Sequence, residues 1–365
     1  MPITTLIGWW ALAAGIVFGA TANKTHFCTM GAISDMVFMD DYGRMRSWVL
    51  AIAVAMIGTT LLHVGGLIDV NDTIYRTANL GWFGAVLGGL MFGFGMTMAG
   101  GCGNKTLVRI GGGNLKSVYV FLVMGVFAIM TLRGLTGMAR VEMEAMTNVD
   151  LGAAGYASQG LEELIAGGVG LDADVVRWII VGLLAGGALV WCFKDAGFRR
   201  SPANLFGGLI IGALIPAGWY ITGVIGFDDF TPQPLMSFTF VAPSGETIQY
   251  LMIFSGATIN FGIASVFGVI LGSFLMALAT KSFNLEGFGD ARDMLRHTFG
   301  ASLMGVGGVL ALGCTIGQGI TGMSTLALSS FLALGAIIFG GVLGMKYMEE
   351  GSLSGALRAM VPGRA

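Results

Sequence analysis

Long apolar stretches alternate with short polar connections along the whole chain. A helix that crosses a bilayer needs about 20 apolar residues. Runs of this length or nearly so, free of Asp, Glu, Lys and Arg, occur at residues 3–23, 47–68, 77–104, 117–132, 178–193, 201–227, 247–280 and 298–345. The last run is long enough for two spans, separated by a Gly-rich stretch. The pattern predicts an all-α polytopic membrane protein with about nine spanning helices and additional short half-helices. Eight or ten spans remain alternatives, because 247–280 could be one long helix or a broken pair.

Composition supports the membrane class and excludes other classes. Of the 365 residues, 55% are hydrophobic and 11% are charged, whereas roughly 25% are charged in a typical soluble domain. The 61 glycines follow no Gly-X-Y period. Inside apolar runs they indicate helices that pack closely or break within the membrane. The net charge of −2 gives no support for a nucleic-acid partner, so the lipid bilayer is the first partner that we expect.

Basic residues in the short connections predict how the chain is oriented. Cytoplasmic loops carry an excess of Lys and Arg. The connections and the tail expected on that side contain Arg44, Arg46, Lys194, Arg199, Arg200, Arg292, Arg296, Lys346, Arg358 and Arg364. Residues 139–176 contain seven acidic residues and one Arg, residues 223–249 contain three acidic residues and no base, and both segments are expected on the periplasmic side. We expect the first apolar stretch to be a transmembrane helix rather than a cleaved signal peptide. The N-terminus would then lie in the periplasm and the C-terminus in the cytoplasm.

Short segments in the two halves of the chain have similar sequences. Residues 98–103 (Met-Ala-Gly-Gly-Cys-Gly) resemble residues 310–315 (Leu-Ala-Leu-Gly-Cys-Thr), and residues 22–27 resemble residues 279–283. Two similar halves around a site at the midplane are a recurrent plan among transporters. We expect a first transmembrane repeat half at residues 1–138 and an acidic periplasmic insertion at residues 139–176. Residues 177–365 would then contain the connecting spans and the second repeat half. The sequence does not decide whether the halves are inverted.

Three of the four cysteines share one setting, in which an apolar helix meets a Gly-rich or polar break. They are Cys28, Cys102 and Cys314. Such a break exposes unpaired N–H groups at a new helix N-terminus, which attracts anions. A lone membrane cysteine is more often a small buried hydrophobe, and Cys192, without Gly neighbours, is interpreted so. The cysteines form no CxxC pair and the histidines lie far apart, so we expect no metal site, no cofactor and no catalytic residue.

Other polar residues accompany these cysteines. Lys24 and Lys105 would attract an anion, although snorkelling towards the membrane surface explains both lysines equally well. Asn104 and Gln318 offer uncharged donors, and Asn104 and Thr315 are expected to cap short helices. Together with the three cysteines, the two lysines, Asn104 and Gln318 form the predicted binding and translocation site.

Four stretches resemble the YeeE/YedE family of sulfur transporters, at residues 25–32, 98–104, 288–293 and 307–319. The most specific of them is Gly-Cys-Thr-Ile-Gly-Gln-Gly at 313–319, and the similarity extends over nearly the whole chain. The resemblance implies thiosulfate uptake across the bacterial inner membrane. It also implies an hourglass-shaped protein whose short helices meet at its waist.

The same resemblance implies roles for individual residues. Cys28, Cys102 and Cys314 would be relay thiols, and a small cytoplasmic sulfur-carrier protein of the YeeD/TusA type would be the partner. Leu285 stands near the expected counterpart of Cys28, so the relay would have three thiols rather than four. No role follows for the acidic insertion at 139–176.

Two other functions fit the same residues. One is a transporter of another small sulfur or selenium anion, since a line of soft thiols suits any of them. The other is a membrane-embedded sulfurtransferase in which a cysteine carries a covalent persulfide. That chemistry needs a low-pKa thiolate beside a base. Cys102, near Lys105 and Arg109, has such neighbours in the sequence, whereas Cys314 lies in a charge-free run.

Overall fold

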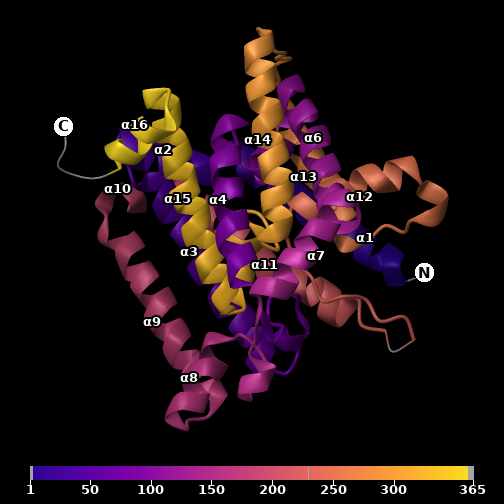
Figure 1. Ribbon diagram of the computed structural model, residues 1–365, viewed down its shortest axis with the longest axis vertical. Helices are drawn as coiled ribbons and strands as arrows, with labels where there is room; N and C mark the ends of the chain where they lie inside the picture. Colours follow the sequence, from indigo (N-terminus) through magenta and orange to yellow (C-terminus); the bar gives the residue numbers. More distant parts are fainter. Residues whose placement is uncertain (1–2, 229, 361–365) are drawn as a thin grey trace.

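The computed structural model describes residues 3–228 and 230–360, and this part of the chain forms a bundle of long helices (Figure 1). Eight helical stretches in the described residues are long and apolar enough to cross a membrane: Ile3–Phe38, Gly43–Val64, Trp82–Gly111, Leu115–Arg133, Ala173–Lys194, Pro202–Ile225, Phe261–Ala279 and Leu328–Glu350. The predicted all-α polytopic membrane fold is confirmed.

The elements follow one another with short connections. The α-helices are α1 (Ile3–Lys24), α2 (Thr29–Phe38), α3 (Gly43–Val64), α4 (Trp82–Met98), α5 (Gly103–Gly111), α6 (Leu115–Arg133), α7 (Leu135–Thr147), α8 (Leu161–Val169), α9 (Ala173–Lys194), α10 (Ala196–Arg199), α11 (Pro202–Tyr220), α12 (Val241–Met252), α13 (Phe261–Ala279), α14 (Ala291–Leu310), α15 (Leu328–Glu350) and α16 (Leu353–Ala359). The shorter helical segments are η1 (Val70–Asp72), η2 (Gly152–Ala154), η3 (Ile221–Ile225), η4 (Phe254–Gly256) and η5 (Gly317–Gly322). Two short strands, β1 (Asn79–Leu80) and β2 (Val149–Asp150), pair antiparallel.

Polar residues fix where several of the long helices begin. The side chains of Asn114, Asn260 and Asp290 accept hydrogen bonds from backbone N–H groups in the first turns of α6, α13 and α14. Such caps satisfy donors that would otherwise be unpaired at a helix N-terminus. The apolar run at 247–280, whose continuity the sequence left open, is broken between α12 and α13.

Helix α14 is not among these eight stretches but is the candidate for a ninth crossing. Its first turns carry Arg292, Asp293 and Arg296, which lower its mean hydropathy. Its 20 residues nevertheless lie between α4 and α6. The eight stretches of the described residues together with α14 would give the nine spans that the apolar pattern predicts, and this number stays a prediction.

Glycines let the crossing helices pack with their backbones in contact. A Cβ atom at Gly93 of α4 would lie 2.1 Å from the carbonyl oxygen of Ile337 in α15, and one at Gly272 of α13 would lie 2.0 Å from that of Ile16 in α1. No larger residue fits at such distances. Close approach of this kind lets dispersion contacts hold membrane helices together without a hydrophobic driving force.

Two sets of helices are equivalent and run in opposite directions. The first set is α1 to α6, and the second is α11, α12, α13, α14, η5 and α15. The contacts between the sets correspond in pairs. The contact of α1 with α13 corresponds to that of α11 with α3, and the contact of α2 with α15 corresponds to that of α12 with α6. The equivalent helices α4 and α14 are antiparallel, because Gly84 lies against Leu310 and Gly95 against Gly300. The repeat is therefore inverted, which the sequence did not decide.

The inverted repeat changes the counterpart of Cys28. The short sequence similarity placed that counterpart near Leu285, which is exposed in the connection between α13 and α14. However, α1 and α13 are parallel neighbours rather than equivalents. Cys28 is the N-cap residue of α2, and Phe240 is the N-cap residue of the equivalent helix α12. Phe240 therefore occupies the position that corresponds to Cys28.

One end of the bundle, the upper end in Figure 1, collects the basic residues of the connections. We call it the basic end: α3 and α14 begin there, and α9 and α15 end there. Its basic residues include Arg44, Arg46, Lys194, Arg199, Arg200, Arg292, Arg296 and Lys346. Helix α8, from the acidic segment, lies at the opposite end (Figure 1).

Candidate functional site

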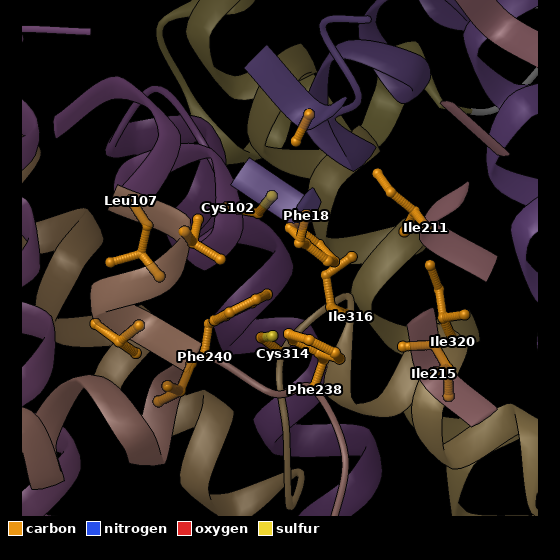
Figure 2. Close-up of a cluster of buried hydrophobic side chains, with 14 of the residues drawn as sticks. Phe18, Cys102, Leu107, Ile211, Ile215, Phe238, Phe240, Cys314, Ile316 and Ile320 are labelled. Atoms are coloured by element: carbon orange, nitrogen blue, oxygen red, sulfur yellow. The ribbon is translucent and has the colours of Figure 1, made fainter. Parts of the chain in front are cut away.

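Three helix breaks bring three cysteines into the buried centre of the bundle. Cys28, Cys102 and Cys314 belong to one continuous apolar cluster, and their exposed fractions are 6%, 0% and 0%. We call these three residues the cysteine cluster; Figure 2 shows Cys102 and Cys314 within it. Cys192 lies in a different cluster, with Leu50 and Phe198. The structure thus groups the three Gly-flanked cysteines and leaves the fourth apart.

The three breaks share a backbone feature that the sequence did not reveal. Each has a residue with a left-handed backbone two positions before its cysteine: His26 (φ 53°), Gly100 (φ 72°) and Leu312 (φ 57°). This conformation ends the preceding helix and redirects the chain towards the next one. It is unfavourable for residues other than Gly, and such strain concentrates at functional sites. Only Gly100 could have signalled it in the sequence.

Two of the cysteines cap the short helices that follow them. The sulfur of Cys28 accepts a hydrogen bond from the N–H of Gly31 at 3.5 Å, and the sulfur of Cys314 accepts one from Gly317 at 3.4 Å. Each S–H hydrogen therefore remains available to another acceptor. The expectation that Asn104 and Thr315 would cap short helices is wrong: α5 has Cys102 as its N-cap and no side-chain cap, and the Thr315 hydroxyl caps no helix among the described residues.

The breaks from the two repeats meet at Cys102. Its thiol lies close enough to that of Cys28 for the two to interact, and the Thr315 hydroxyl lies on its other side. A Cβ atom at Gly103 would be 4.0 Å from the Cβ of Cys314. Thiols of both repeats therefore lie close to one another at Cys102.

Aromatic rings enclose the Cys314 side of the cluster. Phe238 and Phe240 lie beside Cys314 in Figure 2, and Phe18 packs against both rings with centroid distances of 5.3 and 5.2 Å. Such an apolar enclosure excludes water and strengthens any hydrogen bond made inside it. The sequence pattern does not reveal Phe238 and Phe240, because they belong to an extended segment without helical periodicity.

Positive charge lies between the cysteine cluster and the basic end. Lys105, on the first turn of α5, is half-buried and close enough to Cys28 and Cys102 to interact with both electrostatically. Arg109 follows one turn later on the same helix. Lys24, by contrast, is exposed and lines a groove on the outer surface of α1 and α11. The structure therefore brings Lys105 to the cysteines and keeps Lys24 away from them.

The two predicted amide donors have different surroundings. Asn104 is fully buried, and its side-chain oxygen accepts from the Cys102 thiol at 3.5 Å. Gln318 is also fully buried, but its nitrogen donates to the carbonyl of Ala311 and its oxygen accepts from Ser330 at 2.6 Å. Gln318 thus braces the break before α15, and its contact with a substrate stays a prediction.

Inverted repeats whose broken helices meet in a buried central site define a membrane transporter. The family described as "Sulphur transport" matches residues 24–343, and the chain belongs to this family. It is 25% identical over 318 residues to the thiosulfate transporter TsuA of Escherichia coli (strain K12), covering 85% of each chain. It is 27% identical over 327 residues to the thiosulfate transporter TsuA of Spirochaeta thermophila, covering 87% of this chain and 92% of the relative. The resemblance to sulfur transporters is confirmed, and the protein is a transporter rather than an enzyme.

Proposed function

We propose that this protein takes up thiosulfate, and that Cys28, Cys102 and Cys314 pass the ion along by donating hydrogen bonds. The observation that carries the proposal is the meeting of three cysteine-bearing helix breaks in one buried cluster. Thiosulfate is a dianion with a soft terminal sulfur, and a thiol is a weak donor. Weak contacts at several adjacent positions let an ion enter and also leave. The names of the two relatives support this cargo.

The charge distribution supports a direction for the pathway. Basic connections mark the cytoplasmic side of a bacterial inner membrane, so the basic end would face the cytoplasm and the N-terminus the periplasm. The ion would then reach Cys314 first, continue past Cys102 and Cys28, and leave beside Lys105 and Arg109. On the cytoplasmic side, a small sulfur-carrier protein of the YeeD/TusA type would receive the sulfur.

The first prediction separates hydrogen bonding from covalent transfer. Replacing Cys102 by Ala is expected to reduce thiosulfate uptake about ten- to a hundred-fold, because an unmatched polar contact costs roughly 1–3 kcal/mol. Replacing it by Ser keeps a donor of similar shape and should retain part of the uptake. The same pairs of variants apply to Cys28 and Cys314. The measurement is uptake of radiolabelled thiosulfate into liposomes that contain equal amounts of purified protein.

The alternative functions predict different results in this assay. A sulfurtransferase would make the Ser variant as inactive as the Ala variant, because a hydroxyl cannot form a persulfide. Mass spectrometry would then find an extra sulfur on that cysteine during turnover. A transporter of another sulfur or selenium anion would show little uptake of thiosulfate and saturable uptake of the other ion. Either result would replace the proposal.

The second prediction concerns the cysteine outside the cluster. Replacing Cys192 by Ala should leave uptake per folded protein close to wild type. The Cys192 thiol donates to the carbonyl of Arg46 at 3.2 Å and fills a space beside Leu50 and Phe198, where a small buried hydrophobe suffices. The same liposome assay, at matched protein content, checks this. Loss of uptake in folded protein would mean that the pathway also depends on the contact between α3 and α9.

A further inference from the structure

Three buried side chains beside the cysteine cluster carry polar groups that the described residues leave without a hydrogen-bond partner. They are the hydroxyls of Thr29 and Thr315 and the side-chain nitrogen of Asn104. Their residues are 2%, 0% and 0% exposed. Each follows a cysteine of the cluster by one or two positions. Buried polar groups in native proteins are almost always paired, so three such groups at one place indicate a polar ligand.

The surroundings of Cys102 bring two of these groups together, the Asn104 amide and the Thr315 hydroxyl, and Thr29 lies next to them through its backbone. The side-chain oxygen of Asn104 accepts from the Cys102 thiol, so the amide lies against the sulfur with its nitrogen unused. The Thr315 hydroxyl lies beside the same thiol and comes from the opposite repeat. The backbone nitrogen of Thr29 also approaches this sulfur. Donors from both repeats therefore surround one thiol.

We propose that Thr29, Asn104 and Thr315 bind the oxygen end of the transported anion while the thiols contact its terminal sulfur. This inference rests on the proposed thiosulfate function. The two ends of thiosulfate differ chemically: its three oxygens are strong acceptors suited to O–H and N–H donors, and its terminal sulfur is a soft, weak acceptor. Uncharged donors can hold the oxygens without trapping the ion as a buried cation would.

The arrangement selects for a class of substrate. An anion with both oxygens and a terminal sulfur satisfies the hydroxyl and amide donors together with the thiols. Sulfate lacks the soft sulfur, and hydrosulfide lacks the oxygens that the three donors need. A site built to hydrogen-bond one group of a substrate discriminates strongly against analogues without that group, because its buried donors then stay unpaired.

The test compares three variants of threonine. Thr315→Val removes the hydroxyl at nearly constant shape, and Thr315→Ser keeps it. Thr59→Val is the matched control, because the Thr59 hydroxyl is also buried without a partner in the described structure but belongs to α3, beside the contact of Gly58 with Pro216. In liposome uptake assays, the KM for thiosulfate should rise about ten-fold in Thr315→Val. It should stay within about two-fold of wild type in the other two variants.

A second measurement separates substrate binding from a structural role. Inhibition of thiosulfate uptake by hydrosulfide, which has no oxygens, should not weaken in Thr315→Val: its inhibition constant should equal that of wild type or be lower, because one unpaired donor is removed. This inference would be overturned if Thr315→Val weakened the binding of thiosulfate and of hydrosulfide equally. It would also be overturned if the KM for thiosulfate were the same in Thr315→Val and Thr59→Val. Both results would leave the thiosulfate function intact. Absence of saturable thiosulfate uptake by the wild-type protein would instead overturn the proposed function itself.

Discussion

Replacing Glu162 by Gln is expected to lower the melting temperature of the purified protein by about 10 °C, which corresponds to roughly 3–5 kcal/mol. Glu162 accepts hydrogen bonds from both Arg76 and Arg177, and all three side chains are buried. The variant would remove the carboxylate that the two buried guanidinium groups share, and Glu163 would remain as a partner of Arg76. Breaking a buried ion pair on one side is costly because the remaining charge is uncompensated. Thermal unfolding in detergent, followed by intrinsic fluorescence, measures the change.

The control comes from the same acidic segment. Glu144 pairs with Arg140 one helical turn away, and both side chains are partly exposed. Such pairs contribute about 0.3–0.5 kcal/mol, so Glu144→Gln should leave the melting temperature almost unchanged. Similar shifts in the two variants would show that burial does not govern the strength of the Glu162 pairs.

These contacts suggest what the acidic segment at 139–176 does. Beyond the ion pairs, the N–H of Leu161 donates to the carbonyl of Leu326, and the N–H of Leu328 donates to that of Gln159, both at 3.0 Å. The segment is thereby fastened to the connection between η5 and α15. We expect the segment to stabilise the helix break at Cys314. This role does not follow from the sequence of the segment.

Replacing Gly340 by Leu is expected to abolish most of the folded protein. A Cβ atom at this position would lie 2.4 Å from the carbonyl oxygen of Leu90 in α4, and backbone atoms in a packed helix cannot move aside cheaply. The contact between α4 and α15 is one of the larger contacts that join the two repeats, so disrupting it weakens their association. The measurement is the yield of monodisperse protein from detergent-solubilised membranes by size-exclusion chromatography.

Gly335 provides the control on the same helix. Nothing lies within 4 Å of a Cβ atom built at Gly335, so Gly335→Leu should give a yield close to wild type. Both variants insert the same side chain into α15 and alter its helix propensity equally. A low yield from both would assign the loss to helix formation or insertion instead of to packing against α4.

Much of the fold is readable from the sequence because hydropathy acts over whole helices. The long apolar runs predict the crossings, and the flanking glycines distinguish Cys28, Cys102 and Cys314 from Cys192. The repeat was harder to assign. Residues 22–27 and 279–283 are similar because each segment ends a helix. Their similarity reflects this shared local structure, because α1 and α13 are not equivalent helices of the repeat.

Other features of the site have no sequence signature. The left-handed backbone at His26 and Leu312 is imposed by the surrounding packing, since neither residue favours it. The place of Phe240 depends on an extended segment that returns to the centre of the bundle. The unpaired hydroxyl of Thr315 becomes evident only when its surroundings are known.

The exchange of Cys28 for Phe240 at equivalent positions would make the free-energy profile along the proposed pathway asymmetric. The thiol of Cys28 and the ammonium group of Lys105 lie towards the basic end of the cluster, whereas aromatic rings enclose the side of Cys314. An ion would therefore have its energy minimum displaced towards the basic end and its main barrier among the rings. A passive pathway with this profile reaches the same equilibrium in both directions. Its flux, however, saturates at different concentrations when thiosulfate is supplied from one face or from the other.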